Sequence, residues 1–343
     1  LVRDYALHLD CRIFSHERIL SPSCSREFVG CWDLTRIRSL FFLTLAIPMF
    51  TLLAIALPLL GEWAQQEKPP HANHVVLISI DGLRSDALLV LGVKGAPNLH
   101  RLLKGASTLN ARTDPDYSTT LPNHAGMLTG RVTKGKKGHQ WSKNSTPKEK
   151  EILACKGMFE IANQAKIHTA LLATKKKFIL FPNSWPGDIQ EILIKEVPTE
   201  ADVVPIQSEI TAALVGILRS HKTSLTLAHY LGPDVAGHGH GWDLTTGSAY
   251  LKAVQVVDTE IGRLFDTLKE VEILGKSVAI ILTTDHGGGV PFKNHHGIPN
   301  IPVNITIPFV VWMKNFSTKE LYQLNKKTRK DPSIFNPTGK AKV

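Results

Sequence analysis

The stretch Val75-Val-Leu-Ile-Ser-Ile-Asp81-Gly82 decides the fold of this 343-residue chain. Positions 75–80 form an almost unbroken apolar run, which is the pattern of a strand buried on both faces. Similar runs occupy positions 225–230, 278–283 and 307–312. A strand buried on both faces needs helices above and below it, so these runs predict a sheet enclosed between two helical layers.

A long amphipathic helix is predicted between the runs at 225–230 and 278–283. Apolar residues recur there at helical spacing: Leu251, Val254, Val257, Ile261, Leu264, Phe265 and Leu268. Strands that alternate with such helices form mainly parallel sheets, because parallel neighbours need a long crossover connection. We therefore predict an α/β fold, a three-layer α/β/α sandwich with a mainly parallel central sheet.

A membrane segment is predicted ahead of this domain. The run from Leu40 to Leu60 holds 21 residues without a charge and follows Arg36 and Arg38. About 20 apolar residues span a bilayer, and the arginines favour a cytoplasmic N-terminus. The alternative is a signal peptide. The long extension before the run and the poor cleavage site after it argue against cleavage.

The chain divides into four predicted regions. They are an N-terminal extension (1–35), a transmembrane anchor or signal segment (36–64), a polar linker (65–73) and the folded domain (74–343). We assign no fold to the extension, which is either unstructured or the product of an over-extended translation start. The arginines before the apolar run place the folded domain outside the cytoplasm, membrane-anchored or exported.

The chain is basic, with a formal net charge of +10. Its lysines cluster in short runs at 134–137, 175–177 and 326–330, which we interpret as solvated surfaces that attract anions. No aromatic residues interleave with these runs as a nucleic-acid surface requires, so we expect no nucleic-acid partner. Three of the four cysteines precede position 32, and the remaining Cys155 has no partner for a disulfide within the folded domain.

Five short segments carry the residues that point to chemistry. They are Ile80-Asp81-Gly82, Thr120-Leu121-Pro122-Asn123-His124, Pro233-Asp234-Val235-Ala236-Gly237-His238, Thr284-Asp285-His286-Gly287 and His295-His296-Gly297. Most follow a predicted strand or begin a helix, and ligands of open α/β sheets bind beyond the carboxyl ends of the strands. Singly, each segment has an ordinary explanation as a turn or a helix cap. Together they supply three aspartates, three histidines and a hydroxyl, an inventory that suits two tetrahedral zinc sites.

This ordered series resembles the alkaline phosphatase superfamily, and most closely its type I phosphodiesterase/nucleotide pyrophosphatase branch. The similarity extends from about Val75 to about Pro332. The resemblance implies an alkaline phosphatase-like fold and hydrolysis of small phosphate esters with two Zn²⁺ ions as cofactors. One ion would be bound by Asp81, Thr120, Asp285 and His286, and the other by Asp234, His238 and His296.

Within this resemblance Thr120 is the expected nucleophile, since metal coordination lowers the pKa of a hydroxyl. Asn123 lies one helical turn further on, where its amide can donate to a phosphate oxygen. Backbone N–H groups at the same helix start add to that contact. His124 and His240 are expected to be structural. His295 is the alternative to His296 as a ligand, and the glycine after His296 favours His296.

The side chains expected around the substrate differ from those of nucleotide-cleaving relatives. They carry aromatic residues where this chain has Leu121 and His229, so a stacking slot for a nucleobase is not expected. Tyr230 should point to the opposite face of its strand. Trp141 and Trp242 are interpreted as rings packed beneath loops.

Two alternatives stay open. The same site suits a phosphomonoesterase or phosphonate hydrolase, and a catalytically silent, membrane-displayed binding module has the same fold. Complete metal-ligand sets favour an enzyme. The sulfatase branch is disfavoured, because Cys155 lacks the proline and arginine that formylglycine formation needs.

Overall fold

A computed structural model describes residues 71–315, 320–324 and 327. The described residues from Ala72 onward belong to one compact unit. The predicted extension, the membrane segment from Leu40 to Leu60 and the linker up to residue 70 lie outside the described residues, and so does Pro332.

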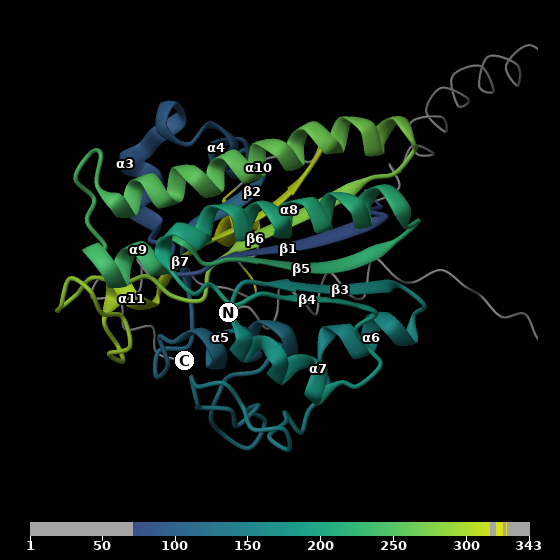
Figure 1. Ribbon diagram of the computed structural model, residues 1–343, viewed down its shortest axis with the longest axis horizontal. Coiled ribbons are helices and arrows are strands. Elements are labelled where there is room, and N and C mark those ends of the chain that lie inside the picture. The colour runs from purple at the N-terminus through teal and green to yellow at the C-terminus, as the bar shows by residue number, and fades with distance from the viewer. Residues whose placement is uncertain (1–70, 316–319, 325–326, 328–343) are drawn as a thin grey trace, which may run out of the picture. The chain divides into compact units, whose positions relative to one another are not determined.

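A seven-stranded sheet in the order β2-β7-β6-β1-β5-β3-β4 forms the middle layer of this unit (Figure 1). Its strands are β1 (His74–Ile80), β2 (Ala106–Arg112), β3 (His168–Ala173), β4 (Glu191–Ile194), β5 (Ser224–Tyr230), β6 (Val278–Thr283) and β7 (Thr306–Met313). The five strands from β6 to β4 are parallel, whereas β7 runs antiparallel to β6 and to β2. The four predicted strands are confirmed as β1, β5, β6 and β7.

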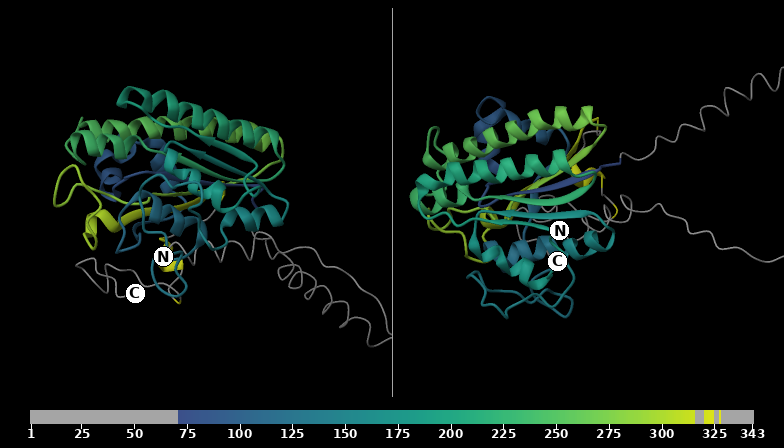
Figure 2. Two further views of the ribbon diagram at one scale, coloured as in Figure 1. Left: turned by 60° about the horizontal axis from the view of Figure 1, so that its bottom comes forward. Right: turned by 45° about the vertical axis from the view of Figure 1, so that its right-hand side comes forward.

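Helices cover both faces of the sheet (Figures 1 and 2). One face carries α3 (Ser85–Gly95), α4 (Pro97–Leu103), α8 (Val203–Ser220) and α10 (Ala249–Ile273). The other face carries α5 (Thr120–Thr129), α6 (Met158–Gln164) and α7 (Leu180–Ser184). The remaining described helices are α9 (Gly232–His240), α11 (Pro302–Ile305), α12 (Leu321–Leu324) and the 3₁₀ turns η1 (Lys176–Ile179) and η2 (Glu200–Asp202). The predicted three-layer sandwich is confirmed.

The two faces of the sheet bury separate apolar layers. In β1, Val76 and Ile78 pack toward α10 and its neighbours, whereas Leu77 packs toward the layer of α5. This alternation is the consequence of the two-residue period of a strand. The predicted amphipathic helix is confirmed as α10, since Val254, Val257 and the other residues of its apolar stripe line the first layer.

One described helical stretch, Glu200–Ser220, is long and apolar enough to cross a membrane by length and composition. Core helices of globular proteins pass the same criteria. Ile210, Leu214 and Ile217 of this stretch are buried in the apolar layer over the sheet, so we interpret it as a core helix.

The parallel strands give the sheet two chemically different edges. At the carboxyl edge, β1, β3, β5 and β6 end at Ile80, Ala173, Tyr230 and Thr283, and at the amino edge they begin at His74, His168, Ser224 and Val278. α9 lies at the carboxyl edge, and the turn from α10 into β6 lies at the opposite end (Figure 1). At about 3.3 Å per residue, the seven residues of β1 separate the edges by about 23 Å.

Candidate metal centre

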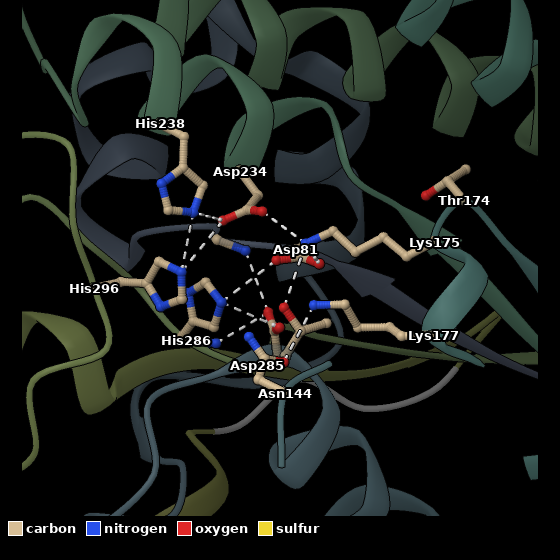
Figure 3. A network of polar contacts seen from close by, with 12 residues as sticks. Asp81, Asn144, Thr174, Lys175, Lys177, Asp234, His238, Asp285, His286 and His296 are labelled. Atoms are coloured by element: carbon tan, nitrogen blue, oxygen red, sulfur yellow. Dashed lines mark hydrogen bonds and ion pairs between the residues drawn. The ribbon is translucent and has the colours of Figure 1, made fainter. Parts of the chain in front are cut away.

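The predicted site residues meet at the carboxyl edge (Figure 3). Asp81 directly follows β1, and Asp285 and His286 follow β6 after one intervening residue. Asp234 and His238 lie four residues apart on α9, and therefore on one face of that helix. Thr120 is the first residue of α5 and is buried. His296 comes from the loop between β6 and α11.

The ligand atoms of these residues form two overlapping groups. In the first, His286 Nε2 lies 3.4 Å from Asp81 Oδ1 and 3.3 Å from Asp285 Oδ2. In the second, His296 Nε2 lies 3.8 Å from Asp234 Oδ1 and 3.1 Å from His238 Nε2. The rings of His286 and His296 stack at a centroid distance of 3.7 Å and join the groups.

Backbone carbonyls fix the orientation of all three histidines. The Nδ1 atoms of His286, His296 and His238 lie 2.8, 2.6 and 3.0 Å from the carbonyl oxygens of Gly287, Ser118 and Asn294. A ring nitrogen beside a carbonyl oxygen must be the N–H donor, which leaves the lone pair on Nε2. Two Nε2 lone pairs that face each other repel unless a cation lies between them.

The donor set fits divalent metal ions. Asp81 Oδ1, Asp234 Oδ1, Asp285 Oδ2 and His286 Nε2 are buried without a hydrogen-bond partner among the described residues. Buried polar atoms normally find partners, and four that converge on one place call for a shared one. Imidazole nitrogens and carboxylate oxygens are ligands that suit zinc.

Lys175 is the residue that the sequence analysis missed. Its ammonium nitrogen lies 2.6 Å from Asp81 Oδ2 and 2.6 Å from Asp234 Oδ2. It also donates to Thr120 Oγ1 at 3.3 Å. The interpretation of 175–177 as a solvated basic surface is therefore wrong for this residue. The available signal was its position two residues after the end of β3, at the same carboxyl edge as the predicted ligands.

Buried polar residues hydrogen-bond to Asp81 and to the backbone of the candidate nucleophile Thr120. His229 Nε2 lies 3.0 Å from Asp81 Oδ2, and its Nδ1 lies 2.8 Å from Thr174 Oγ1. His124 bridges the Thr120 carbonyl and Ser79 Oγ through its two ring nitrogens, as a structural histidine does.

The helix start at Thr120 has few free donors. Asn123 Nδ2 donates one hydrogen to the Asp285 carbonyl at 2.7 Å, which leaves its second amide hydrogen for another acceptor. The N–H groups of Leu121 and Asn123 donate to Asn144 Oδ1 and the Thr119 carbonyl. Of the backbone N–H groups expected to contact a phosphate at this helix start, only that of Thr120 is not already engaged among the described residues.

Burial and neighbouring charges separate the acidities of the aspartates. Burial opposes ionisation of Asp81, yet Lys175 and the His229 hydrogen bond hold the pKa of its carboxyl well below the usual value. Burial and then the Asp81 carboxylate raise the pKa of Asp285 to about 7. Burial and the adjacent His286 lower the pKa of His296 to about 3, so its imidazole is neutral.

Gly82 brings three parts of the site into contact. Its φ of +70° lies in the left-handed region, and a Cβ there would meet Asp234 Cα at 3.1 Å. Its N–H donates to Asp285 Oδ1 at 3.2 Å. Its carbonyl accepts from Trp242 Nε1 and the Tyr250 hydroxyl, each at 2.9 Å. A side chain at this position would separate the two metal-ligand groups.

The other candidates contribute no atom to the two ligand groups. His295 is exposed, and His240 pairs with Glu200 on the surface. Leu121 is buried in the layer of α5, and Trp141 and Trp242 are buried rings, as expected. Tyr230 points to the other face of β5 from His229, where its hydroxyl contacts Thr211 of α8.

The chain matches the family described as type I phosphodiesterase/nucleotide pyrophosphatase over residues 75–136 and 154–332. Over 235 residues it is 32% identical to ectonucleotide pyrophosphatase/phosphodiesterase family member 1 of Mus musculus. That alignment covers 65% of this chain and 24% of the mouse protein. The chain thus spans about a quarter of the length of this relative.

Solved structures share the fold at low sequence identity. A protein in the alkaline phosphatase superfamily from Vibrio parahaemolyticus has a TM-score of 0.51 and 14% identity, over 73% of this chain and 62% of its own. A lipoteichoic acid synthase from Listeria monocytogenes has a TM-score of 0.51 and 12% identity, over 78% and 72%. These similarities confirm the predicted alkaline phosphatase-like fold.

We predict that metal affinity falls as the pH drops through 7. Below the pKa of about 7 of Asp285, a metal must displace the proton of this carboxyl. Zinc affinity, measured by competition with a chromogenic chelator, should fall by at least about tenfold per pH unit below 7. Asp285→Asn has no carboxyl proton to lose, so the slope of its log zinc affinity against pH should be shallower by about one. Equal slopes in the variant and the wild type would contradict the role of Asp285 as the titrating ligand.

Proposed function

The chain belongs to the type I phosphodiesterase/nucleotide pyrophosphatase family, and from that premise we propose that it hydrolyses phosphate esters through Thr120 with two zinc ions. The observation that carries the proposal is the convergence of three unpartnered carboxylate oxygens and the unpartnered Nε2 of His286 near the Thr120 hydroxyl, with which Lys175 connects them. That convergence supports a metal-dependent enzyme over a catalytically silent binding module, which has no use for such a donor set.

The proposed ligands divide as the family resemblance implies. Asp81, Thr120, Asp285 and His286 would hold one ion, and Asp234, His238 and His296 the other. When bound, the ions supply positive charge that lowers the pKa of the Thr120 hydroxyl and offsets the charge of the phosphoryl oxygens.

The residues of the chain then have distinct parts in the reaction. Thr120 Oγ1 loses its proton to water and attacks phosphorus, and the bond from phosphorus to the ester oxygen breaks. That oxygen takes a proton from water and departs as the alcohol, and a water molecule later displaces Thr120 from phosphorus. The Lys175 ammonium, 3.3 Å from that oxygen, favours its deprotonated form. The second amide hydrogen of Asn123 is the proposed donor to a phosphoryl oxygen.

The same proposal assigns the domain a place outside the cytoplasm. The run from Leu40 to Leu60 would tether it to the membrane, and its partner in solution would be a small phosphate ester. This assignment depends on the charge pattern of the run, because its residues lie outside the described ones.

Cleavage of a phosphomonoester or phosphonate is a second candidate, favoured by Lys177. This half-buried lysine lies beside Lys175 and donates to Asn144 Oδ1 at 3.3 Å. Asn144 in turn accepts the N–H of Leu121, the residue after the nucleophile. Burial and the neighbouring Lys175 lower the pKa of Lys177. A second cation that Asn144 links to the residue after Thr120 suits a substrate with more than one negative charge.

Replacing Thr120 by alanine should lower turnover of an aryl phosphate diester by at least about a thousandfold, because the nucleophile is lost. Thr120→Ser should retain part of the activity. Thr119→Ala is the matched control, since Thr119 precedes the helix and its side chain makes no capping hydrogen bond. If Thr120→Ala hydrolysed the diester as fast as Thr119→Ala, the assignment of Thr120 as the nucleophile would be refuted. Wild-type protein without bound zinc and without turnover would favour the binding module.

Lys177→Met should reduce kcat/KM for an aryl phosphate monoester about tenfold more than for the corresponding diester, because the monoester carries the additional charge. Lys176→Met is the matched control on the same 3₁₀ turn, where its side chain is 66% exposed beside Glu196. Equal losses for both esters in the Lys177 variant would exclude a role in charge selection.

We predict little discrimination among nucleobases. Leu121 and His229 are fully buried, and Trp141 and Trp242 are only 8% and 3% exposed, so these side chains offer no ring face to a base. Stacking contributes about 1–3 kcal/mol per base where a ring is available. The kcat/KM of a nucleoside-monophosphate aryl ester should lie within about tenfold of that of a methyl aryl diester. A preference above about a hundredfold would contradict this arrangement.

A further inference from the structure

The amino edge of the sheet carries a row of lysines. Five of the strands that meet this edge have a lysine one or two residues outside the strand. In sheet order they are Lys104 before β2, Lys314 after β7, Lys276 before β6, Lys222 before β5 and Lys166 before β3. Neighbouring strands lie about 4.8 Å apart, so the row follows the edge for about 24 Å.

Most of this positive charge is not neutralised. Glu272 pairs with Lys314, and Glu270 pairs with Arg219. Within the described part of the chain, no carboxylate lies at ion-pair distance from Lys104, Lys166 or Lys222. All three are exposed. Lys104, Lys166 and Lys222 therefore offer free ammonium groups to anions, whereas Lys314 pairs with Glu272 and Lys276 donates to the carbonyls of Leu218 and Arg219.

An apolar tip projects from the same edge. Ile273, the last residue of α10, and Leu274, which follows it, are 85% and 61% exposed. Single exposed apolar side chains are common on protein surfaces. Two adjacent ones at the tip of a turn, next to a line of lysines, have the composition of a surface that enters the interface of an anionic bilayer.

A cavity of about 340 Å³ lies beside this tip. Phe265 and Trp312 contribute its aromatic lining, with ring centroids 5.1 Å apart, and the Arg101 guanidinium lies 3.9 Å from the centroid of Phe265. Lys269, Lys276, Lys314 and Glu272 also line it. Glu272 pairs with Lys314 and Asp266 with Lys269, so Arg101 and Lys276 are the lining cations without a carboxylate partner among the described residues. Apolar and cationic groups side by side suit a phosphate headgroup with the start of its acyl chains.

The chain also enters the domain at this edge. Residues 61–71 separate Leu60, the end of the predicted membrane segment, from Ala72, just before β1. At no more than about 3.6 Å per residue, these eleven residues span at most about 40 Å. If the apolar run crosses the bilayer, the amino edge is the part of the described domain nearest to the membrane along the chain.

We propose that the amino edge is a membrane-contact surface for bilayers that contain anionic phospholipid. Ile273 and Leu274 enter the interface, the lysine row contacts headgroup phosphates, and the cavity holds one headgroup. Because the carboxyl edge lies at the other end of the strands, Thr120 then faces away from the bilayer and receives its substrate from the aqueous phase. The proposal is independent of the reaction at Thr120.

The test uses the full chain with Cys11, Cys24, Cys31 and Cys155 replaced by serine. Leu274→Cys carries an NBD fluorophore, and the protein is reconstituted into vesicles of phosphatidylcholine with or without about 30% phosphatidylserine. Anionic vesicles should shift the emission to the blue and raise its intensity severalfold, and high salt should reverse both changes. The same label on Phe292→Cys, in the loop that carries His296, should keep a water-like spectrum in both vesicles.

Matched triple substitutions test the lysine row. Lys104→Glu, Lys166→Glu and Lys222→Glu together should weaken docking at least about a hundredfold, since each lysine near an anionic surface contributes about fivefold. Lys134→Glu, Lys136→Glu and Lys137→Glu change the net charge equally in the loop after α5 and should leave docking intact. The unfolding temperature of each variant verifies its fold.

Three results would overturn the proposal. The first is a water-like Leu274 label in anionic vesicles. The second is an equal loss of docking in both triple variants, which would reduce the effect to net charge. The third is a blue shift of the Leu274 label that is equally large in neutral vesicles, or one that grows with protein concentration in detergent. Either result would indicate that the label contacts a second copy of the chain. Salt titration of the Leu274-labelled protein without lysine substitutions tests the proposal even if a lysine variant fails to fold.

Discussion

The carboxylates of Asp81, Asp234 and Asp285 meet, buried, at one edge of the sheet, and the rest of the site depends on keeping these like charges together. Charged groups removed from water are costly unless opposite charges share the space. Lys175 provides one such charge, in contact with two of the three aspartates. The unpartnered carboxylate oxygens and the Nε2 atom of His286 are donors that suit divalent ions. Lys175 and the His229 hydrogen bond hold the pKa of Asp81 down against the effect of burial, whereas burial and the Asp81 carboxylate raise the pKa of Asp285.

The parallel sheet makes this concentration of charge possible. Its strands end at the same edge, so Asp81 and Asp285 become neighbours although 204 positions separate them in the chain. The backbone then fixes the side chains, because carbonyl groups hold the Nδ1 atoms of the histidines and leave every Nε2 directed inward. Trp242 lies under His238 and His296 and is anchored to the Gly82 carbonyl. Rings and carboxylates are thus placed by packed elements, and little rearrangement is needed to bind an ion.

The same polarity leaves the amino edge free for attachment. The carboxyl edge collects acidic and imidazole ligands from strand ends, whereas the amino edge collects lysines and an exposed apolar turn. The proposed tether at the amino edge and the proposed reaction at the carboxyl edge would then be separated by the length of a strand, about 23 Å. In the arrangement that we propose, membrane contact and substrate entry do not compete for one surface.

The sequence by itself determined four of the strands, one long helix and the candidate ligands. Long apolar runs revealed β1, β5, β6 and β7, and a regular helical period revealed α10, because each of these signals is contained in one segment. The polar residues after those strands indicated the site, because parallel strands end together. The tertiary structure alone decided what depends on packing between distant segments. β2 is polar and irregular in register, and β4 has only four residues, so neither produces a clear period. Lys175 has the same sequence context whether its ammonium lies in solvent or between two aspartates, and only the packing of β3 beside β5 brings it to Asp81 and Asp234.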